Sequence, residues 1–234
     1  MPGRLFIVAT PIGNLEDITL RALRVLSEAD VIFAEDTRRT AQLLAHHRIR
    51  KPLISCHAFS EARRSGEIVR RVREGERVAL VSDAGTPGIS DPGFRVVRAC
   101  VRENLPVEPV PGPCAAIAAL SAAGLPGDEF HFAGFLPAKA AAARRRLQEL
   151  SRVPGVLVLY ESPWRLMRTL GELATLFPGH EVVVGREISK KFEEFCRGGA
   201  ADLLARFNER APKGEFVILV HNCPTEDHEV SYAE

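Results

Sequence analysis

Residues 77–93 read RVALVSDAGTPGISDPG, an apolar run that passes directly into a loop of glycines, prolines and small polar residues. The run 77–82 is rich in valine and leucine, as buried strands are. The loop after it holds three glycines, two prolines and the carboxylates of Asp83 and Asp91. Loops at the carboxyl end of a strand are where α/β sheets bind ligands. The stretch therefore predicts an α/β fold with a ligand site at this strand end; the alternative is that Ser90 or Asp91 only caps the next helix.

The same alternation of short apolar runs and helical patterns continues along the chain. Candidate strands lie at 5–10, 31–34, 52–55, 77–82, 106–110, 130–135, 155–160, 181–185 and 215–220. Candidate helices lie at 18–28, 38–47, 61–73, 94–103, 114–123, 139–150, 163–176 and 200–210. Asp17 and Ser60 stand where N-caps are expected for two of these helices. The alternation predicts α/β layers, without fixing the order of strands in a sheet.

The stretch PVEPVPGPC, residues 106–114, is the best candidate for a boundary between domains. Its prolines cannot lie inside a helix or a central strand, so they favour an extended connection. We therefore expect an N-terminal α/β domain over 1–111 and a C-terminal α/β domain over 112–234.

The charge balance gives no overall signal for nucleic acid. The 234 residues include 31 Lys and Arg against 30 Asp and Glu, a net charge of +1, whereas nucleic-acid-binding domains often have an isoelectric point above about 9. The distribution is uneven, however. The stretch from Arg38 to Arg73 holds ten basic residues and two acidic ones, which favours contact with a polyanion. The stretch from His221 to Glu234 is acidic without Lys or Arg, and we expect a solvated tail there.

The five cysteines indicate neither a disulfide framework nor a metal site. They are widely spaced and never form a CxxC pair, so free thiols in a reducing cytosol are the expected state. The start, MPGRLFIVATPIGN, has too short an apolar run for a signal peptide, and no run approaches the ~20 residues of a membrane helix. We therefore expect a soluble cytoplasmic protein with no membrane contact.

The first candidate strand runs into TPIGN, residues 10–14, where Gly13 permits close approach of a ligand to the backbone. A single glycine does not make the GxGxxG fingerprint of a dinucleotide site. The loop 82–93 has no Gly-Lys-Ser/Thr and is not a P-loop. The sequence therefore does not favour a nicotinamide, flavin or P-loop nucleotide site. The loop 10–14 is either a ligand-binding loop or a plain turn between a strand and a helix.

Seven ordered motifs, spread over about residues 8–194, resemble one family. They are VATPIGNLEDITLRAL, FAEDTRRT, SDAGTPGISDPG, VPGPCAAIAALSAAGLP, GFLPAK, YESPWR and GREISKKFEE. In this order and spacing they are similar to the ribosomal RNA small subunit methyltransferase I family, a branch of the tetrapyrrole methylases.

The resemblance implies a two-domain tetrapyrrole-methylase fold with S-adenosylmethionine in the interdomain cleft, and a homodimer. It implies that the enzyme methylates the ribose 2′-hydroxyl of a cytidine in 16S ribosomal RNA, within the 30S subunit. The residues expected to contact the cofactor come from the two loops, the segment after the linker and the YES motif: Pro11, Asp83, Gly85, Thr86, Ser90, Cys114, Ala115, Tyr160 and Glu161.

A ribose hydroxyl is a poor nucleophile, so such an enzyme must position it and ease the loss of its proton. We favour Arg186, Glu187 and Lys190, which follow a candidate strand, for contacts with the substrate and for catalysis. An interdomain ion pair is the other interpretation of Arg186 and Glu187. The base itself stays open, and the other candidates are Glu35, Asp36, Arg38, His57 and Glu161.

The basic stretch offers candidate contacts for RNA. Arg63 and Arg70, like Arg64 and Arg71, are seven residues apart and share a helix face, which suits phosphate contacts. Arg38 joins them as a candidate, and a solvated surface helix is the alternative. Other functions considered are methylation of a corrin-type macrocycle or of a translation factor, and RNA binding without catalysis.

Overall fold

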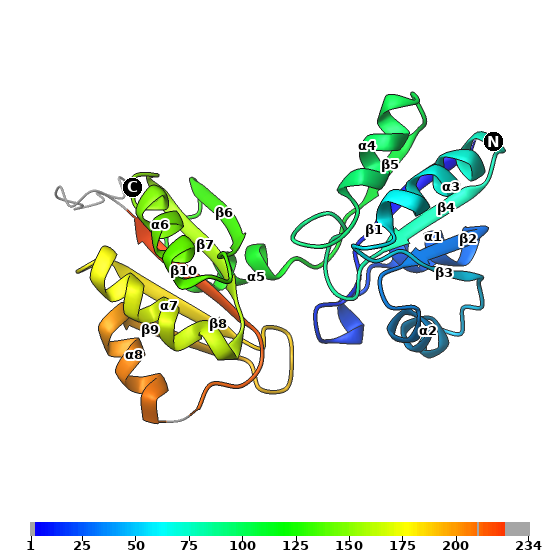
Figure 1. Cartoon of the computed structure of the whole chain (residues 1–234). Helices are drawn as coiled ribbons and strands as arrows, with labels where there is room; N and C mark the ends of the chain where they lie inside the picture. Colours follow the sequence, from blue (N-terminus) through cyan, green and yellow to red (C-terminus); the bar gives the residue numbers. More distant parts are fainter. Residues whose placement is uncertain (1–2, 210, 223–234) are drawn as a thin grey trace, which may run out of the picture. The chain divides into compact units, whose positions relative to one another are not determined.

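The computed structural model describes residues 3–209 and 211–222. Their contacts divide the chain into two compact units, with the division between Ala115 and Ala116, just after the proline-rich stretch. We call them unit 1 and unit 2. Each contains its own five-stranded sheet with helices packed against it (Figure 1).

Unit 1 has a fully parallel sheet with the strand order β3-β2-β4-β1-β5. Its strands are β1 (Arg4–Val8), β2 (Val31–Ala34), β3 (Leu53–Ser55), β4 (Arg77–Val81) and β5 (Val107–Val110). Its helices are the 3₁₀ turn η1 (Leu15–Asp17), α1 (Leu20–Glu28), α2 (Thr37–His46), α3 (Glu61–Arg73) and α4 (Phe94–Arg102). Because all five strands are parallel, their carboxyl ends lie at one edge of the sheet.

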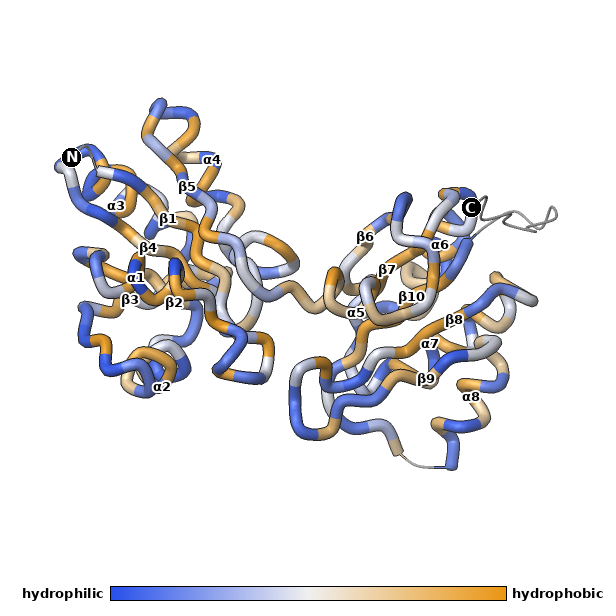
Figure 2. The backbone as a smooth tube through the Cα atoms, turned by 180° about the vertical axis from the view of Figure 1, so that it is seen from behind, coloured by the Kyte–Doolittle hydropathy of each residue, from blue (hydrophilic) through white to orange (hydrophobic). Residues whose placement is uncertain are grey.

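Helices cover both faces of this sheet, as a parallel sheet requires. Phe6 and Val8 of β1 face one core, which α1 and α2 complete, and Leu5 faces a second core, which α3 and α4 complete. Successive strand residues thus point to opposite cores. Figure 2 shows the hydrophobic colours along these strands. The near-continuous apolar runs of the sequence reflect this double burial.

Unit 2 has a mixed sheet with the order β6-β7-β10-β8-β9. Only β6 and β7 pair in parallel, and the other pairs are antiparallel. Its strands are β6 (Phe130–Phe135), β7 (Gly155–Glu161), β8 (Glu181–Arg186), β9 (Glu194–Gly199) and β10 (Phe216–Asn222). Its helices are α5 (Ala115–Ala123), α6 (Ala140–Leu150), α7 (Pro163–Leu176) and α8 (Ala200–Glu209), of which α6, α7 and α8 close the main core.

Two local features differ from the sequence-based expectations. The strand β9 was not expected, because its sequence EFCRGG lacks an apolar run. Helix α1 begins after Thr19, whose hydroxyl accepts the Ala22 amide, and Asp17 lies in η1 instead of capping α1. The Ser60 hydroxyl bonds to His57 and makes no capping bond to α3.

Some expectations concern residues outside this description. The acidic tail falls almost entirely on residues 223–234, which lie outside the described residues, as does Cys223. In the described part, Cys56, Cys100, Cys114 and Cys196 are free thiols. The helices of residues 3–209 and 211–222 include none long and apolar enough to cross a bilayer, and these ranges contain no cluster of three potential metal ligands.

Candidate functional site

The loops after β1 and β4 meet at the carboxyl edge of the unit 1 sheet. The Thr10 amide donates to the Gly85 carbonyl at 2.9 Å, and the Gly85 amide donates to the Thr10 carbonyl at 3.0 Å. Gly85 has φ +79°, a conformation that glycine adopts without strain. A side chain there would sit 3.6 Å from Ile12 and 3.8 Å from the Pro113 carbonyl. Both loops and the end of the linker therefore lie close together around Gly85, next to the segment that carries Cys114 and Ala115.

A cavity of about 190 Å³ opens beside these loops. It is lined by residues of both loops, of η1 and of α2: Thr10, Pro11, Leu15, Arg39, Thr40, Gln42, Leu43, Ser82 and Asp83. The expected cofactor residues Pro11 and Asp83 both line it.

Asp83 connects the loop after β4 to the start of α2. Its Oδ1 accepts the Asp36 amide at 2.9 Å, and its Oδ2 lies 3.6 Å from the Arg39 guanidinium. Asp36 in turn caps α2 and pairs with Arg38, which draws the pKa of Asp36 down to about 2. The Arg38 side chain, expected to contact RNA, is thus held by Asp36.

Negative charge is concentrated around Asp83. Burial, and then the charge of Asp83, raise the pKa of Glu35. Burial, and then the charge of Glu35, raise the pKa of Asp91 to about 6. Carboxylates that resist ionisation in this way mark a place where a cationic ligand would be stabilised.

The far end of the loop 82–93 is held by Glu61, a residue that the sequence reasoning did not select. Its side chain is 7% exposed, and its Oε1 accepts the amides of Gly93 at 2.9 Å and Arg95 at 2.8 Å. Glu61 thus caps α4, whose N-cap is Gly93 and not Ser90 or Asp91. Thr86 is half-buried within the loop, whereas Ser90 is exposed with φ +62°.

In unit 2 the two residues of the YES motif that are expected to contact the cofactor, Tyr160 and Glu161, make different kinds of contact. The Tyr160 hydroxyl accepts the Ala116 amide at 3.2 Å, and its ring packs edge-on against Phe132 and Phe135. Glu161 is 2% exposed, and its carboxylate is engaged by the Ser162 amide, the Thr169 hydroxyl and the Arg165 guanidinium, each within 2.8 Å. Those bonds occupy both Glu161 oxygens, so the side chain fixes the start of α7.

Arg186, Glu187 and Lys190 lie together in unit 2, and their partners belong to the same unit. Lys190 Nζ contacts Glu187 Oε1 at 2.9 Å and Glu215 Oε2 at 2.7 Å. The Glu187 Oε1 also accepts the Glu215 amide at 2.9 Å. Arg186 donates to the Lys213 carbonyl at 2.7 Å and lies 3.5 Å from Glu194. These contacts are not interdomain ion pairs.

This network determines the protonation of its members. Burial acts to raise the pKa of Glu187, but hydrogen bonds from Lys190 and from the Glu215 amide outweigh it, and the pKa lies below its usual value. Burial acts to lower the pKa of Lys190, but hydrogen bonds to Glu215 and Glu187 outweigh it, and the pKa lies above its usual value. Both residues therefore keep their charges at neutral pH.

Most of the α3 arginines expected to contact RNA carry ion pairs. Arg64 and Arg71 both pair with Glu67 between them, Arg71 also pairs with Glu76, and Arg70 pairs with Glu74. Arg63 is exposed and has no ion pair to any residue of the described ranges.

Comparison with known proteins agrees with this architecture. The model of the family Tetrapyrrole (Corrin/Porphyrin) Methylases matches residues 4–204. Among solved structures, a uroporphyrin-III-C-methyltransferase from Thermus thermophilus aligns with a TM-score of 0.62 and 25% identity, over 94% of this chain and 95% of that one. The methyltransferase CobJ aligns with a TM-score of 0.70 and 21% identity, over 96% of each chain, which shows the common fold. The chain therefore belongs to the tetrapyrrole methylases.

Two curated relatives narrow this class. A protein of Pseudomonas aeruginosa named ribosomal RNA small subunit methyltransferase I is 50% identical over 221 residues, which cover 93% of this chain and 78% of the relative. A protein of Thermotoga maritima with the same name is 46% identical over 218 residues, which cover 93% of this chain and 98% of the relative. Within the tetrapyrrole methylases, the chain belongs to the ribosomal RNA small subunit methyltransferase I family.

Proposed function

We propose that this protein uses S-adenosylmethionine to methylate the 2′-hydroxyl of a cytidine ribose in small-subunit (16S) ribosomal RNA. The observation that carries the proposal is the joining of the loops 10–14 and 82–93 through Thr10 and Gly85, in a chain half identical to a ribosomal RNA small subunit methyltransferase I. We further propose that it acts in the cytoplasm, on the assembled 30S subunit.

The residues of unit 1 suit this cofactor. S-adenosylmethionine carries a sulfonium and an ammonium charge, together with ribose hydroxyls, and has no phosphate. The loops offer main-chain groups at Thr10 and Gly85 and the carboxylate of Asp83. Burial first, and neighbouring carboxylates second, raise the pKa of Glu35 and of Asp91 beside them, and a cationic ligand would stabilise their charged forms. A cavity of about 190 Å³ is smaller than the roughly 300–1,000 Å³ of whole ligand pockets. Unit 1 alone would therefore hold only a part of the cofactor.

We assign the cofactor contacts to residues of both units. In unit 1, Pro11, Asp83, Gly85 and Thr86 surround or adjoin the cavity, with Cys114 and Ala115 at the end of the linker and Ser90 at the loop's outer rim. In unit 2, Tyr160 contributes through its ring, and Glu161 through its main chain, because its carboxylate is already engaged. We also propose 1–111 and 112–234 as the two domains.

When bound, the cofactor supplies an electrophilic methyl group. The chain must hold the ribose oxygen near it and accept the hydroxyl proton. A carboxylate with a pKa raised toward neutrality accepts a proton more readily than one whose pKa is lowered. We therefore propose Glu35 or Asp91 as the acceptor, and we assign Arg186, Glu187 and Lys190 to positioning the RNA backbone through their fixed charges.

We also propose that the protein forms a homodimer. Large apolar side chains are exposed on unit 2, with Trp164 at 92% and Phe192 at 64% exposure. Exposed aromatic residues of this size are enriched at protein interfaces. Light scattering after size-exclusion chromatography should give twice the 25.7 kDa chain mass, and a monomer at micromolar concentration would contradict the dimer.

Transfer of a labelled methyl group tests the proposed reaction. The full chain is incubated with S-adenosylmethionine and either naked 16S rRNA, 30S subunits or a tetrapyrrole, and the RNA is digested to nucleosides. We expect label in 2′-O-methylcytidine, whereas label on a base, on protein or on the tetrapyrrole would refute the assignment. Asp83→Ala should abolish transfer, and Asp128→Ala is the matched control, because Asp128 is exposed and has no ion pair within the described ranges.

A further inference from the structure

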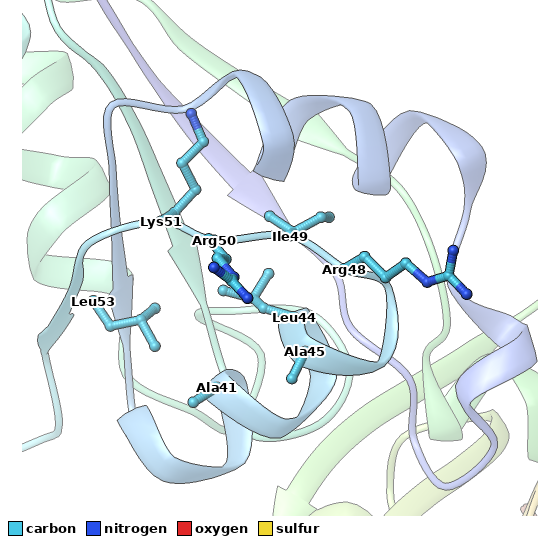
Figure 3. Close-up of a pocket in the computed structure, with 8 residues that line it drawn as sticks. All are labelled: Ala41, Leu44, Ala45, Arg48, Ile49, Arg50, Lys51 and Leu53. Carbon is cyan, nitrogen blue, oxygen red and sulfur yellow. The ribbon is translucent and has the colours of Figure 1, made fainter.

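A groove of about 670 Å³ lies between the end of α2 and the start of β3 (Figure 3). Its floor is apolar and its rim is basic: Ala41, Leu44, Ala45, Ile49 and Leu53 line it together with Arg48, Arg50 and Lys51. The lining includes no acidic residue. In Figure 3 the Arg50 side chain lies over the middle of the groove, while Arg48 and Lys51 extend from its rim in different directions.

The three cations of the groove have no ion pair with any residue that the structure describes. This separates them from Arg64, Arg70 and Arg71 of α3, whose charges are offset by glutamates. Three unpaired charges within four residues repel one another, and such an arrangement is stabilised by a polyanion.

The backbone that carries these cations is fixed. Arg48 follows the C-cap of α2 and has φ +57°; its amide bonds to the Ala45 carbonyl, and the Ile49 amide bonds to the Leu44 carbonyl. The buried Leu44 and the bond from the Ile32 amide to the Pro52 carbonyl hold the two ends of the segment. The cations are therefore presented by a preorganised turn, which lowers the entropy cost of binding.

The position of the groove relates it to the candidate site of unit 1. Asp36, whose amide bonds to Asp83, is the N-cap of α2, and the other end of this helix lies at the groove. Its ten residues span about 15 Å, at 1.5 Å per residue. A single strand of a few nucleotides covers this length, so one strand could reach both places.

We infer that this groove, formed by Arg48, Arg50 and Lys51 around the apolar floor, binds the phosphate backbone of single-stranded ribosomal RNA beside the methylated nucleotide. The inference rests on the proposed function, because it assumes an RNA substrate. The cations contact successive phosphates, and the exposed apolar surface of Ala41 and Ala45 accepts an unstacked base. The main electrostatic contact of unit 1 with RNA is thus this groove and not helix α3.

The test measures affinity for a 16S rRNA fragment as a function of salt, using fluorescence anisotropy and the full chain. The variant replaces Arg48, Arg50 and Lys51 by Gln. Each phosphate contact to a single strand contributes about 0.7 to the slope of log K against log salt, so three lost contacts reduce the slope by about 2. At 0.15 M salt this corresponds to an affinity loss on the order of 50-fold.

A matched variant removes the same charge elsewhere. Arg102, Arg145 and Arg152 are exposed and lack ion pairs within the described ranges, and they are replaced together by Gln. This variant should lose less than about threefold in affinity and keep the slope. If the triple groove variant proves unstable, the double variant Arg50→Gln with Lys51→Gln should still lose on the order of 10-fold.

The outcomes separate this inference from the proposed function. If the unmodified protein methylates rRNA and the groove variant keeps its affinity or its salt slope, the groove inference is refuted and the function stands. Loss of activity on 30S subunits with unchanged affinity for naked RNA would indicate a protein partner and also refute it. If the unmodified protein neither binds nor methylates rRNA, the proposed function itself fails. Cofactor affinity, measured by calorimetry, should be the same for all these proteins.

Discussion

Glu61 gives the sharpest test of how the ligand loop is held. Both amides that it caps, those of Gly93 and Arg95, bond to the same oxygen, Oε1. Glu61→Ala removes this acceptor and leaves two amides of the first α4 turn without a partner. Hydrogen bonds to charged groups contribute about 1.5–3 kcal/mol each, and water can replace part of this at Arg95, so we expect a loss of about 2–4 kcal/mol. Glu61→Gln keeps one carbonyl oxygen for both amides and should cost only about 1 kcal/mol.

Native-state hydrogen exchange of the Gly93 and Arg95 amides measures this loss directly. The matched control is Glu74→Ala, at the C-cap of α3, because Glu74 is exposed and its ion pair in the described ranges is with the exposed Arg70; it should change stability by less than about 1 kcal/mol. Equal protection in Glu61→Ala and the unmodified protein, or equal damage from Gln and Ala, would refute the reasoning.

Further predictions concern pH and packing. The folded pKa of Asp91, about 6, exceeds its model-peptide value of 3.8, so the stability that protonated Asp91 contributes is complete below about pH 4 and is lost as the pH rises through about 6. Asp91→Asn should remove this dependence in denaturation curves and stabilise the protein by about 1–2 kcal/mol at pH 8, after allowance for solvent screening; an unchanged pH profile would contradict the shift. Gly214 has φ +97°, and an added Cβ would lie 2.5 Å from Glu187 Cγ, so Gly214→Ala should cost roughly 2–3 kcal/mol in urea denaturation. Gly179→Ala, at φ +78° with no atom within 4 Å, should cost only about 1 kcal/mol, and equal losses at both glycines would argue against the Glu187 contact.

Much of the fold could be predicted from the sequence, because buried parallel strands leave a strong apolar signal. Each of β1–β8 and β10 begins or ends within a few residues of an expected strand. The exception is β9, with the sequence EFCRGG. It is an edge strand and only partly buried, so its sequence needs no continuous apolar run. The start of α1 was misjudged because Asp17 and Thr19 are both good caps, and only the backbone geometry separates them.

The candidate site was less predictable than the fold. The loops 10–14 and 82–93 were identifiable because glycine and carboxylates follow strands there. Glu61 was not, because a glutamate at the start of a helix ordinarily faces solvent, and its partners lie 32 and 34 residues away. Likewise, the lowered pKa of Glu187 depends on the distant Glu215 amide as well as on Lys190.

The basic stretch shows a similar limit. The basic stretch, residues 38–73, ends just before Glu74 and Glu76. Both of these glutamates pair with arginines of α3. Charge in the sequence therefore overstated the free charge of that helix. Three cations without ion pairs in the described ranges, Arg48, Arg50 and Lys51, lie close together after the end of α2, where the sequence shows no periodic pattern.

Mass spectrometry can identify the methylated nucleoside in 30S subunits incubated with S-adenosylmethionine and either the unmodified protein or Asp83→Ala. We expect one additional 2′-O-methylcytidine per 16S rRNA with the unmodified protein and none with the variant. A methyl group on a base, no methylation by the unmodified protein, or full methylation by Asp83→Ala would contradict this expectation.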